Sequence, residues 1–190
     1  MMDAPDSELM SRLAAGDDLA LNELMRRWSA RVSAFLYRMT GRRDTAVDLA
    51  QETFVKLYQA RARYKPQGNF STYLFAIAAN LARNHGRWMA RHPTVSLDAT
   101  AADGAEVSPE AVDPKQTPGE AALAREKSAA VNRAILSLSV DLREALTLFI
   151  HKGLGYAEIA ELTGCSAKAV ETRIYRARQI LKEQLQDLRS

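Results

Sequence analysis

A stretch in the middle of the chain is unsuited to a packed core and divides the sequence in two. Residues 92–119 hold four of the six prolines, and no aromatic residue occurs between Trp88 and Phe149. Ala, Asp, Thr and Ser fill much of this stretch, and they bury too little apolar surface to offset the entropy lost on ordering. The sequence therefore predicts a flexible linker over 92–119, a domain before it over 1–91 and a smaller domain after it over 120–190.

In both predicted domains, apolar residues recur with the 3.6-residue period of an α-helix, and no alternating run of strand length occurs. The predicted fold class is therefore all-α, with two small helical domains. Before the linker we expect two short helices parted by residues 16–18, a longer one ending at Gly41, one capped by Asp44 or Thr45, and one from Ser71 or Thr72 to about Arg91. After the linker the expected helices span about 118–138, 140–152, 156–163 and 166–187.

Charge falls into blocks along the chain. Residues 53–97 contain seven Lys or Arg and no Asp or Glu. Between residues 98 and 120 the sign reverses, with six acidic residues against Lys115. From Cys165 to Lys182, five basic residues face only Glu171. Two basic blocks on either side of an acidic linker indicate a protein that contacts a polyanion twice, although either block alone also fits a solvated helix face.

The strongest local motif is a helix-turn-helix over residues 156–178. Ala160 is small where two helices would cross, Gly164 permits a sharp turn, and Ser166 can cap the second helix. The second helix of such a motif enters the DNA major groove and reads base edges, while basic residues further along bind phosphates. An ordinary helical hairpin is the alternative. The DNA-binding residues predicted here are Ser166, Lys168, Glu171, Thr172, Arg173, Tyr175, Arg176 and Arg178.

The helix that precedes the linker carries a second candidate DNA surface. Its core side is predicted at Leu74, Ile77, Ala78, Leu81 and Trp88. Asparagine can pair with base edges and arginine with phosphates or guanine, and the adjacent face holds Asn80, Asn84, Arg87 and Arg91. Aromatic rings beside a basic groove hold unstacked bases, and three rings crowd around the preceding loop: Tyr64, Phe70 and Tyr73. The alternative is that these rings belong to the core.

The helix before the basic block has an acidic face, formed by Asp48, Gln51 and Glu52. Carboxylates on a DNA-binding domain repel phosphate, so we expect this face to meet a protein, although a simply solvated surface also fits. The apolar positions of the same helix are predicted at Val47, Leu49, Ala50, Phe54 and Leu57.

Several classes of protein do not fit this sequence. A single cysteine, Cys165, excludes an internal disulfide and a cysteine-rich zinc site, so a reducing cytoplasmic location is expected. No apolar run of membrane-spanning length and no secretory signal occur, so no membrane insertion is expected. His85, His92 and His151 share no metal-ligand spacing, and no phosphate-binding glycine motif is present. We therefore expect no catalytic residue, metal, cofactor or small-molecule substrate.

Taken in order, these segments resemble an extracytoplasmic-function sigma factor of the sigma-70 family, over Asp6 to about Leu185. The resemblance rests on DLAQETFVKLYQA at 48–60, YKPQGNFSTYLFAIAANLARN at 64–84, the linker and the helix-turn-helix. It implies a subunit that binds core RNA polymerase and promoter DNA and directs promoter-specific initiation. It also implies restraint by an anti-sigma factor.

The resemblance assigns roles to single segments, with 1–91 as region 2 and 120–190 as region 4. The β′ clamp of polymerase would receive Asp48, Gln51, Glu52 and Phe54, and the β flap would receive residues around 138–154. The helix from Ser166 would read the −35 element, and the acidic linker would thread the RNA channel. Capture of a flipped −10 base would involve Tyr64, Asn69, Phe70, Ser71, Tyr73, Asn80, Asn84, Arg87 and Arg91.

Four departures from the family's usual pattern leave the promoter sequence open: Tyr73, Ser139, the run 167–169 and the acidic Glu171. The alternative function is a stand-alone helix-turn-helix regulator. Such a regulator would need a dimer interface to read paired half-sites, and no apolar seam outside the two predicted cores supplies one. A pure adaptor protein would leave both basic blocks unexplained.

Overall fold

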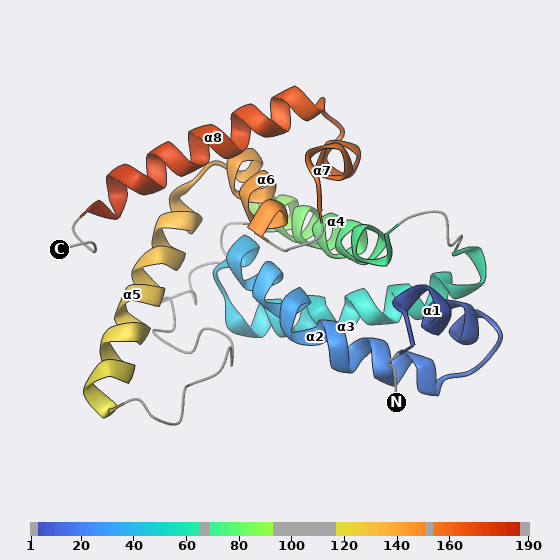
Figure 1. Ribbon diagram of the computed structural model, residues 1–190. Helices are drawn as coiled ribbons and strands as arrows, with labels where there is room; N and C mark the ends of the chain where they lie inside the picture. The colour runs from blue at the N-terminus through green and yellow to red at the C-terminus, as the bar shows by residue number, and fades with distance from the viewer. Residues whose placement is uncertain (1–3, 65–68, 93–116, 151–153, 187–190) are drawn as a thin grey trace.

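Helices make up the regular structure of this computed structural model, which describes residues 4–64, 69–92, 117–150 and 154–186 (Figure 1). The predicted all-α class is confirmed, because no strand occurs among the described residues. Most of the predicted linker, residues 93–116, lies outside them. No described helix combines the length and apolarity needed to cross a membrane. The elements are α1 Asp6–Ala14, α2 Leu19–Thr40, α3 Arg43–Ala60, the 3₁₀ turn η1 Arg61–Arg63, α4 Phe70–Arg91, α5 Pro118–Ser137, α6 Val140–Ile150, α7 Tyr156–Thr163 and α8 Ala167–Gln184.

The second helix is longer than the sequence pattern predicted. Where a short helix followed by a longer one was expected, α2 runs unbroken for 22 residues, because it contains no Gly or Pro to interrupt its hydrogen-bond ladder. It ends at Gly41, as predicted, with a φ of +73° and its N–H donating to the Tyr37 carbonyl at 2.8 Å. A β carbon at Gly41 would lie 2.9 Å from a methyl carbon of Leu136, so the Leu136 side chain would have to shift, and the positive φ would strain any residue that has a β carbon.

The start positions of α3 and α4 differ slightly from the prediction. α3 begins at Arg43, so the predicted caps Asp44 and Thr45 lie inside its first turn. There the Asp44 carboxylate still faces the positive end of the helix dipole. α4 is capped by Asn69, whose Oδ1 accepts a hydrogen bond from the Ser71 N–H at 3.3 Å. The helix therefore begins one residue before Ser71, the earlier of its two predicted starts.

The core is organised around α2, which contacts α1, α3 and α4. Phe35 of α2 is fully buried and meets Phe75 of α4 edge to face, with ring centroids 5.4 Å apart. Trp28, about two helical turns closer to the N-terminus of α2, makes a similar contact with Phe70 at 5.7 Å. These ring contacts fix the N-terminal half of α4 against α2 and leave its other face outward. The buried side chains of α2 are Ala20, Leu24, Trp28, Val32, Phe35, Leu36 and Met39.

Helices from the C-terminal part of the chain pack on the same bundle. α2 contacts α5 and α6, and α4 contacts α7, while the N-terminal end of α5, yellow in Figure 1, stands away from α2. The half-buried Arg143 of α6 bridges the parts, donating to the Met39 carbonyl and to the Leu138 carbonyl at 3.0 Å each. Burial lowers the pKa of Arg143. Buried residues of the N-terminal helices α1–α4 and of the C-terminal helices also form one continuous apolar cluster.

Two residues that were predicted in the core are exposed. Val47 on α3 is 42% exposed and Trp88 on α4 is 41% exposed. No residue of α4 beyond Ala82 is buried, because the helix continues past the elements packed on it. Trp88 instead stacks on His92, with ring centroids 4.7 Å apart. Helical periodicity alone cannot show where along a helix its packing partners end.

We predict that Leu57→Ala on α3 lowers the free energy of unfolding by about 3 kcal/mol, because it removes a fully buried side chain and leaves a cavity. Val55→Ala on the same helix is the control, since Val55 is 52% exposed, and it should change stability by less than about 0.5 kcal/mol. Urea unfolding followed by circular dichroism measures both. Equal effects of the two substitutions would contradict the assignment of the core.

Candidate nucleic-acid interface

The C-terminal half of α4 presents a polar face to solvent. Asn80, Asn84, Arg87 and Arg91 are all exposed, and their spacing of three or four residues puts them on one side of the helix. Asn84 Oδ1 accepts a hydrogen bond from Arg87 Nη2 at 3.1 Å, and Arg91 Nε donates to the Arg87 carbonyl at 3.2 Å. Arg83 donates to Asn80 Oδ1. The structure thus brings the four predicted residues together.

The three rings near the start of α4 divide into a buried one and two accessible ones. Phe70 is only 4% exposed, so its ring belongs to the core, which was the alternative considered from the sequence. Tyr64 and Tyr73 are half-buried, with ring centroids 5.2 Å apart, and Tyr64 also contacts Phe70 at 6.5 Å. Burial raises the pKa of both tyrosines, so both hydroxyls are neutral at neutral pH. Tyr64 and Tyr73 are the rings that a nucleobase could reach.

The other two predicted residues of this segment differ in accessibility. Asn69 is exposed while it caps α4. Ser71 is 4% exposed, so its side chain faces the interior of the bundle. A direct base contact by Ser71 or Phe70 is therefore not supported by their positions, and the contact predicted for Asn69 stays a prediction.

The helix-turn-helix has the local geometry that the sequence predicted. Gly164 ends α7 in the left-handed conformation, with a φ of +66°. Ser166 then caps α8, its Oγ accepting a hydrogen bond from the Ala169 N–H at 3.1 Å. Val170, Ile174 and Ala177 are buried where α8 packs against α6 and α7. The opposite face of α8 is consequently turned to solvent.

That outer face of α8 holds most of the residues predicted from the motif. Lys168, Glu171, Tyr175, Arg176 and Arg178 are exposed. Lys168 Nζ lies 2.8 Å from Glu171 Oε2, and this hydrogen bond raises the pKa of Lys168. A hollow of about 350 Å³ opens beside these side chains, lined by Tyr156, Lys168, Glu171, Thr172, Ile174, Tyr175 and Arg178.

Arg173 is placed differently from its predicted neighbours. Its Nη2 lies 3.4 Å from Asp141 Oδ2 of α6, and its Nη1 lies 3.4 Å from Cys165 Sγ. The guanidinium therefore faces α6 and the turn before α8 instead of the exposed face. Sequence spacing could not reveal this, because Asp141 lies 32 residues away along the chain.

We define the α3 face as Val47, Asp48, Gln51, Glu52 and Val55. All five residues are exposed. The sequence pattern did not predict the two valines as surface residues. Each lies four residues from Gln51, and residues four apart share one side of a helix, so this spacing could have indicated their exposure. An acidic surface flanked by exposed apolar side chains suits contact with another protein. Phe54, predicted for the same surface, is 4% exposed and packs in the core.

A polar contact between α4 and the helices α6 and α7 was not anticipated from the sequence. Arg83 Nη1 lies 2.7 Å from Glu144 Oε1, and the Glu144 side chain is only 5% exposed. Burial raises the pKa of Glu144, while the charge of Arg83 acts in the opposite direction. Near the start of α4, Thr72 Oγ1 donates to Glu158 Oε1 of α7 at 2.6 Å.

Known proteins similar to this chain match it over almost its whole length. Residues 24–91 match the family model of Sigma-70 region 2, and residues 128–181 match Sigma-70, region 4. The RNA polymerase sigma-H factor of Pseudomonas aeruginosa is 35% identical over 184 residues, which cover 96% of this chain and 95% of that protein. The ECF RNA polymerase sigma-E factor of Escherichia coli is 35% identical over 187 residues, with the same coverage.

Two solved structures have a similar fold. CnrH, in complex with the cytosolic domain of CnrY, aligns over 96% of this chain and 97% of its own, with a TM-score of 0.67 and 24% identity. The sigma factor RpoE of Bartonella quintana, in complex with the anti-sigma factor NepR, aligns over 87% and 96%, with a TM-score of 0.68 and 23% identity.

We predict that Ser166→Ala lowers the free energy of unfolding by about 1 kcal/mol, because α8 loses the side-chain cap of its first turn. Ser166→Asn keeps an acceptor at this position and should retain most of that stability. The control is Gln179→Ala on the exposed side of α8, with an expected change below about 0.5 kcal/mol. Chemical denaturation compares the three proteins. An unchanged Ser166→Ala protein would show that the cap contributes nothing to stability.

Proposed function

The chain belongs to the extracytoplasmic-function (ECF) family of RNA polymerase sigma factors, and we propose that it reads a promoter with α4 and α8. This agrees with the resemblance noted from the sequence. Its function is to bind core RNA polymerase and direct promoter-specific initiation of transcription. The observation that carries the assignment of surfaces is that one chain exposes two separate basic faces, one on each of these helices. Its action is binding, and we assign it no catalytic step.

Recognition of the −10 element is assigned to the polar face of α4 with Tyr64 and Tyr73. Asn80 and Asn84 present amide groups that can pair with a base edge, and Arg87 and Arg91 supply charge for the phosphates. The two half-buried tyrosine rings offer a platform for an unstacked base, which is worth about 1–3 kcal/mol per base. The absence of acidic residues from 53 to 97 keeps this surface free of charges that repel phosphate.

Recognition of the −35 element is assigned to α8. In a helix-turn-helix, the N-terminal residues of the second helix reach base edges in the major groove. Lys168, Glu171 and Thr172 occupy that part of α8, and Arg176 and Arg178 lie further along, where they can bind phosphates. Glu171 can accept a hydrogen bond from a cytosine amino group, so we expect it to contribute to sequence preference.

Polymerase contact is assigned to the α3 face, which would meet the β′ clamp, and to residues around 138–154, which would meet the β flap. Binding to polymerase would hold the two DNA-reading helices at a fixed separation, so that two weak contacts act as one strong contact. The acidic residues of 98–120 suit passage through a cationic RNA channel. We place the protein in the cytoplasm, restrained by an anti-sigma factor, as the Bartonella relative is bound by NepR.

The alternative is a stand-alone helix-turn-helix regulator that binds DNA as a dimer without polymerase. Run-off transcription with purified core RNA polymerase, on the DNA upstream of the protein's own gene, separates the two functions. A sigma factor yields a discrete transcript that depends on the added protein, and it co-elutes with core polymerase on a sizing column. A stand-alone regulator does neither and binds its DNA site by itself.

We predict that the double variant Asn80→Ala/Asn84→Ala reduces run-off transcription by about tenfold or more, because each amide–base pairing is worth about 1–3 kcal/mol. Core polymerase should bind this variant as tightly as it binds the unmodified protein, since both side chains lie away from the α3 face. Lys168→Ala is the matched comparison and should weaken binding to −35 duplex DNA while sparing the −10 element. Loss of polymerase binding by the double variant would contradict the assignment of this α4 face.

A further inference from the structure

The N-terminal helix α1 lies beside the segment to which −10 recognition is assigned. Its buried side chains are Leu9, Met10 and Leu13, and it contacts both α2 and η1, which leads directly into Tyr64. The match to Sigma-70 region 2 begins only at residue 24, so α1 lies outside that matched segment. None of the α1 residues was a predicted site residue.

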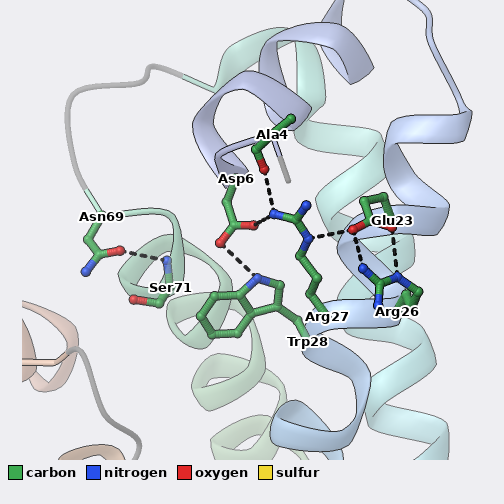
Figure 2. Close-up of polar contacts among 8 residues, drawn as sticks. All are labelled: Ala4, Asp6, Glu23, Arg26, Arg27, Trp28, Asn69 and Ser71. Carbon is green, nitrogen blue, oxygen red and sulfur yellow. Dashed lines mark hydrogen bonds and ion pairs between the residues drawn. The ribbon is translucent and has the colours of Figure 1, made fainter. Parts of the chain in front are cut away.

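At the start of α1, the Asp6 carboxylate holds two side chains of α2 (Figure 2). Its Oδ2 accepts a hydrogen bond from Trp28 Nε1 at 3.0 Å, and its Oδ1 accepts one from Arg27 Nη1 at 3.1 Å. Arg27 is held in turn by the Ala4 carbonyl at 2.6 Å and by Glu23 Oε1 at 2.7 Å. Hydrogen bonds from Arg26 and Arg27 lower the pKa of Glu23 to about 2, so this carboxylate is charged at neutral pH.

From Trp28 a chain of ring contacts leads to the accessible tyrosines. The Trp28 ring meets Phe70 edge to face at 5.7 Å, Phe70 meets Tyr64 at 6.5 Å, and Tyr64 meets Tyr73 at 5.2 Å. Among the described residues, the buried Tyr64 hydroxyl has no hydrogen-bond partner. Ring packing therefore fixes the position of Tyr64, and that packing begins at the indole that Asp6 orients.

We propose that Asp6 is a positioning residue for −10 recognition, acting through Trp28 and Phe70 on Tyr64 and Tyr73. This inference rests on the proposed function of α4. Removal of the carboxylate leaves the Trp28 N–H without its acceptor and lets the indole turn. The rings behind it then lose the arrangement in which a single-stranded base stacks on them. Asp6 itself touches no DNA in this proposal.

The test uses polymerase holoenzyme assembled with Asp6→Ala, Asp6→Asn or the unmodified protein. The probe is fork-junction DNA with a single-stranded −10 strand, taken from the promoter that run-off transcription identifies. We expect Asp6→Ala to weaken binding of this probe about tenfold, the equivalent of losing one base stack. Asp6→Asn keeps an oxygen that can accept the Trp28 hydrogen bond, so it should restore binding to within about threefold. Affinities for core polymerase and for −35 duplex DNA should not change.

Asp17→Ala is the matched control, because it breaks the Arg12–Asp17 ion pair of 2.7 Å and the hydrogen bond of 3.1 Å from the Leu19 N–H, near the other end of α1, and removes no contact of Trp28. It should bind the fork-junction probe normally. Full probe binding by Asp6→Ala overturns the proposal. A parallel loss of polymerase, −35 and fork-junction binding also overturns it, because it shows that Asp6 only maintains the fold. If the unmodified holoenzyme itself fails to bind the probe, the proposed function fails instead.

A separate observation concerns the contact between α4 and the helices α6 and α7. The Arg83–Glu144 ion pair and the Thr72–Glu158 hydrogen bond join the helix assigned to the −10 element to the unit that carries α8. Arg83 also donates to the Leu162 carbonyl at 3.3 Å. Elements centred at −10 and −35 lie about 25 base pairs apart, or about 85 Å along B-DNA. α8 packs on α6 and α7, so while α4 is hydrogen-bonded to these two helices α4 and α8 cannot reach both elements at once.

We infer that the Arg83–Glu144 pair, together with the packing of α5 and α6 on α2, holds the free protein in a closed arrangement that polymerase must open. A buried ion pair suits this role, because its attraction is largely offset by the desolvation of both charges and water solvates both once the helices separate. The contact is therefore specific in geometry and modest in net free energy. Along α4, Arg83 lies between Asn80 and Asn84, which are assigned to DNA. Its own guanidinium is directed to α6 and α7 in this arrangement.

Small-angle scattering of the free protein tests this second inference. We expect a compact particle for the unmodified protein and a larger radius of gyration for Arg83→Ala and for Glu144→Ala. Arg83→Lys keeps a cation for the Glu144 carboxylate and should stay compact. Association with core polymerase should be about tenfold faster for the two alanine variants, the scale of a typical coupling free energy. An extended unmodified protein, or alanine variants that match it in size and rate, overturns the inference. So does an Arg83→Lys protein that is as extended as Arg83→Ala.

Discussion

Burial of α2 is the interaction on which the rest of the structure depends. This helix contacts α1, α3, α4, α5 and α6, and near its C-terminal end the Met39 carbonyl accepts a hydrogen bond from Arg143 of α6. Each large side chain that it buries stabilises the fold by about 1.5–3 kcal/mol, and Phe35 and Trp28 also set the orientation of their partners through ring contacts. The position of α4, and so of its polar face, follows from how α4 packs on this one helix.

The surfaces assigned to DNA and to polymerase are the helix faces that remain exposed to solvent after this packing. α4 and α8 each bury one apolar stripe, and their opposite faces carry amides and basic residues. The α3 face combines acidic and apolar side chains, which suits a protein partner better than phosphate. The sign of the surface charge therefore differs between the α3 face, assigned to polymerase, and the faces of α4 and α8, assigned to DNA. The fold supplies only the orientation in which each of those charges meets solvent.

Two polar contacts between distant segments lie where function is assigned. Asp6 reaches the indole of Trp28 across two helices, and Arg83 reaches Glu144 across 61 residues of sequence. Both contacts lie in partly desolvated surroundings, where geometry matters more than in water. A hydrogen bond to an indole orients a ring, whereas a buried ion pair holds two bodies together at little net gain in free energy. These different physical properties suit a positioning role and a reversible closure, respectively.

Most of the features that were predicted correctly from the sequence depend on residues close together along the chain. Helical periodicity gave the all-α class, and the turns at Gly41 and Gly164 and the cap at Ser166 depend on residues only a few positions away. The sequence also determined the charge blocks, the exposed amide and arginine face of α4, and the family. Tertiary structure alone decided that Phe70 is buried and that Arg173 faces α6. The physical reason is that burial and ion pairing depend on partners far away along the chain, which periodicity within one helix cannot reveal.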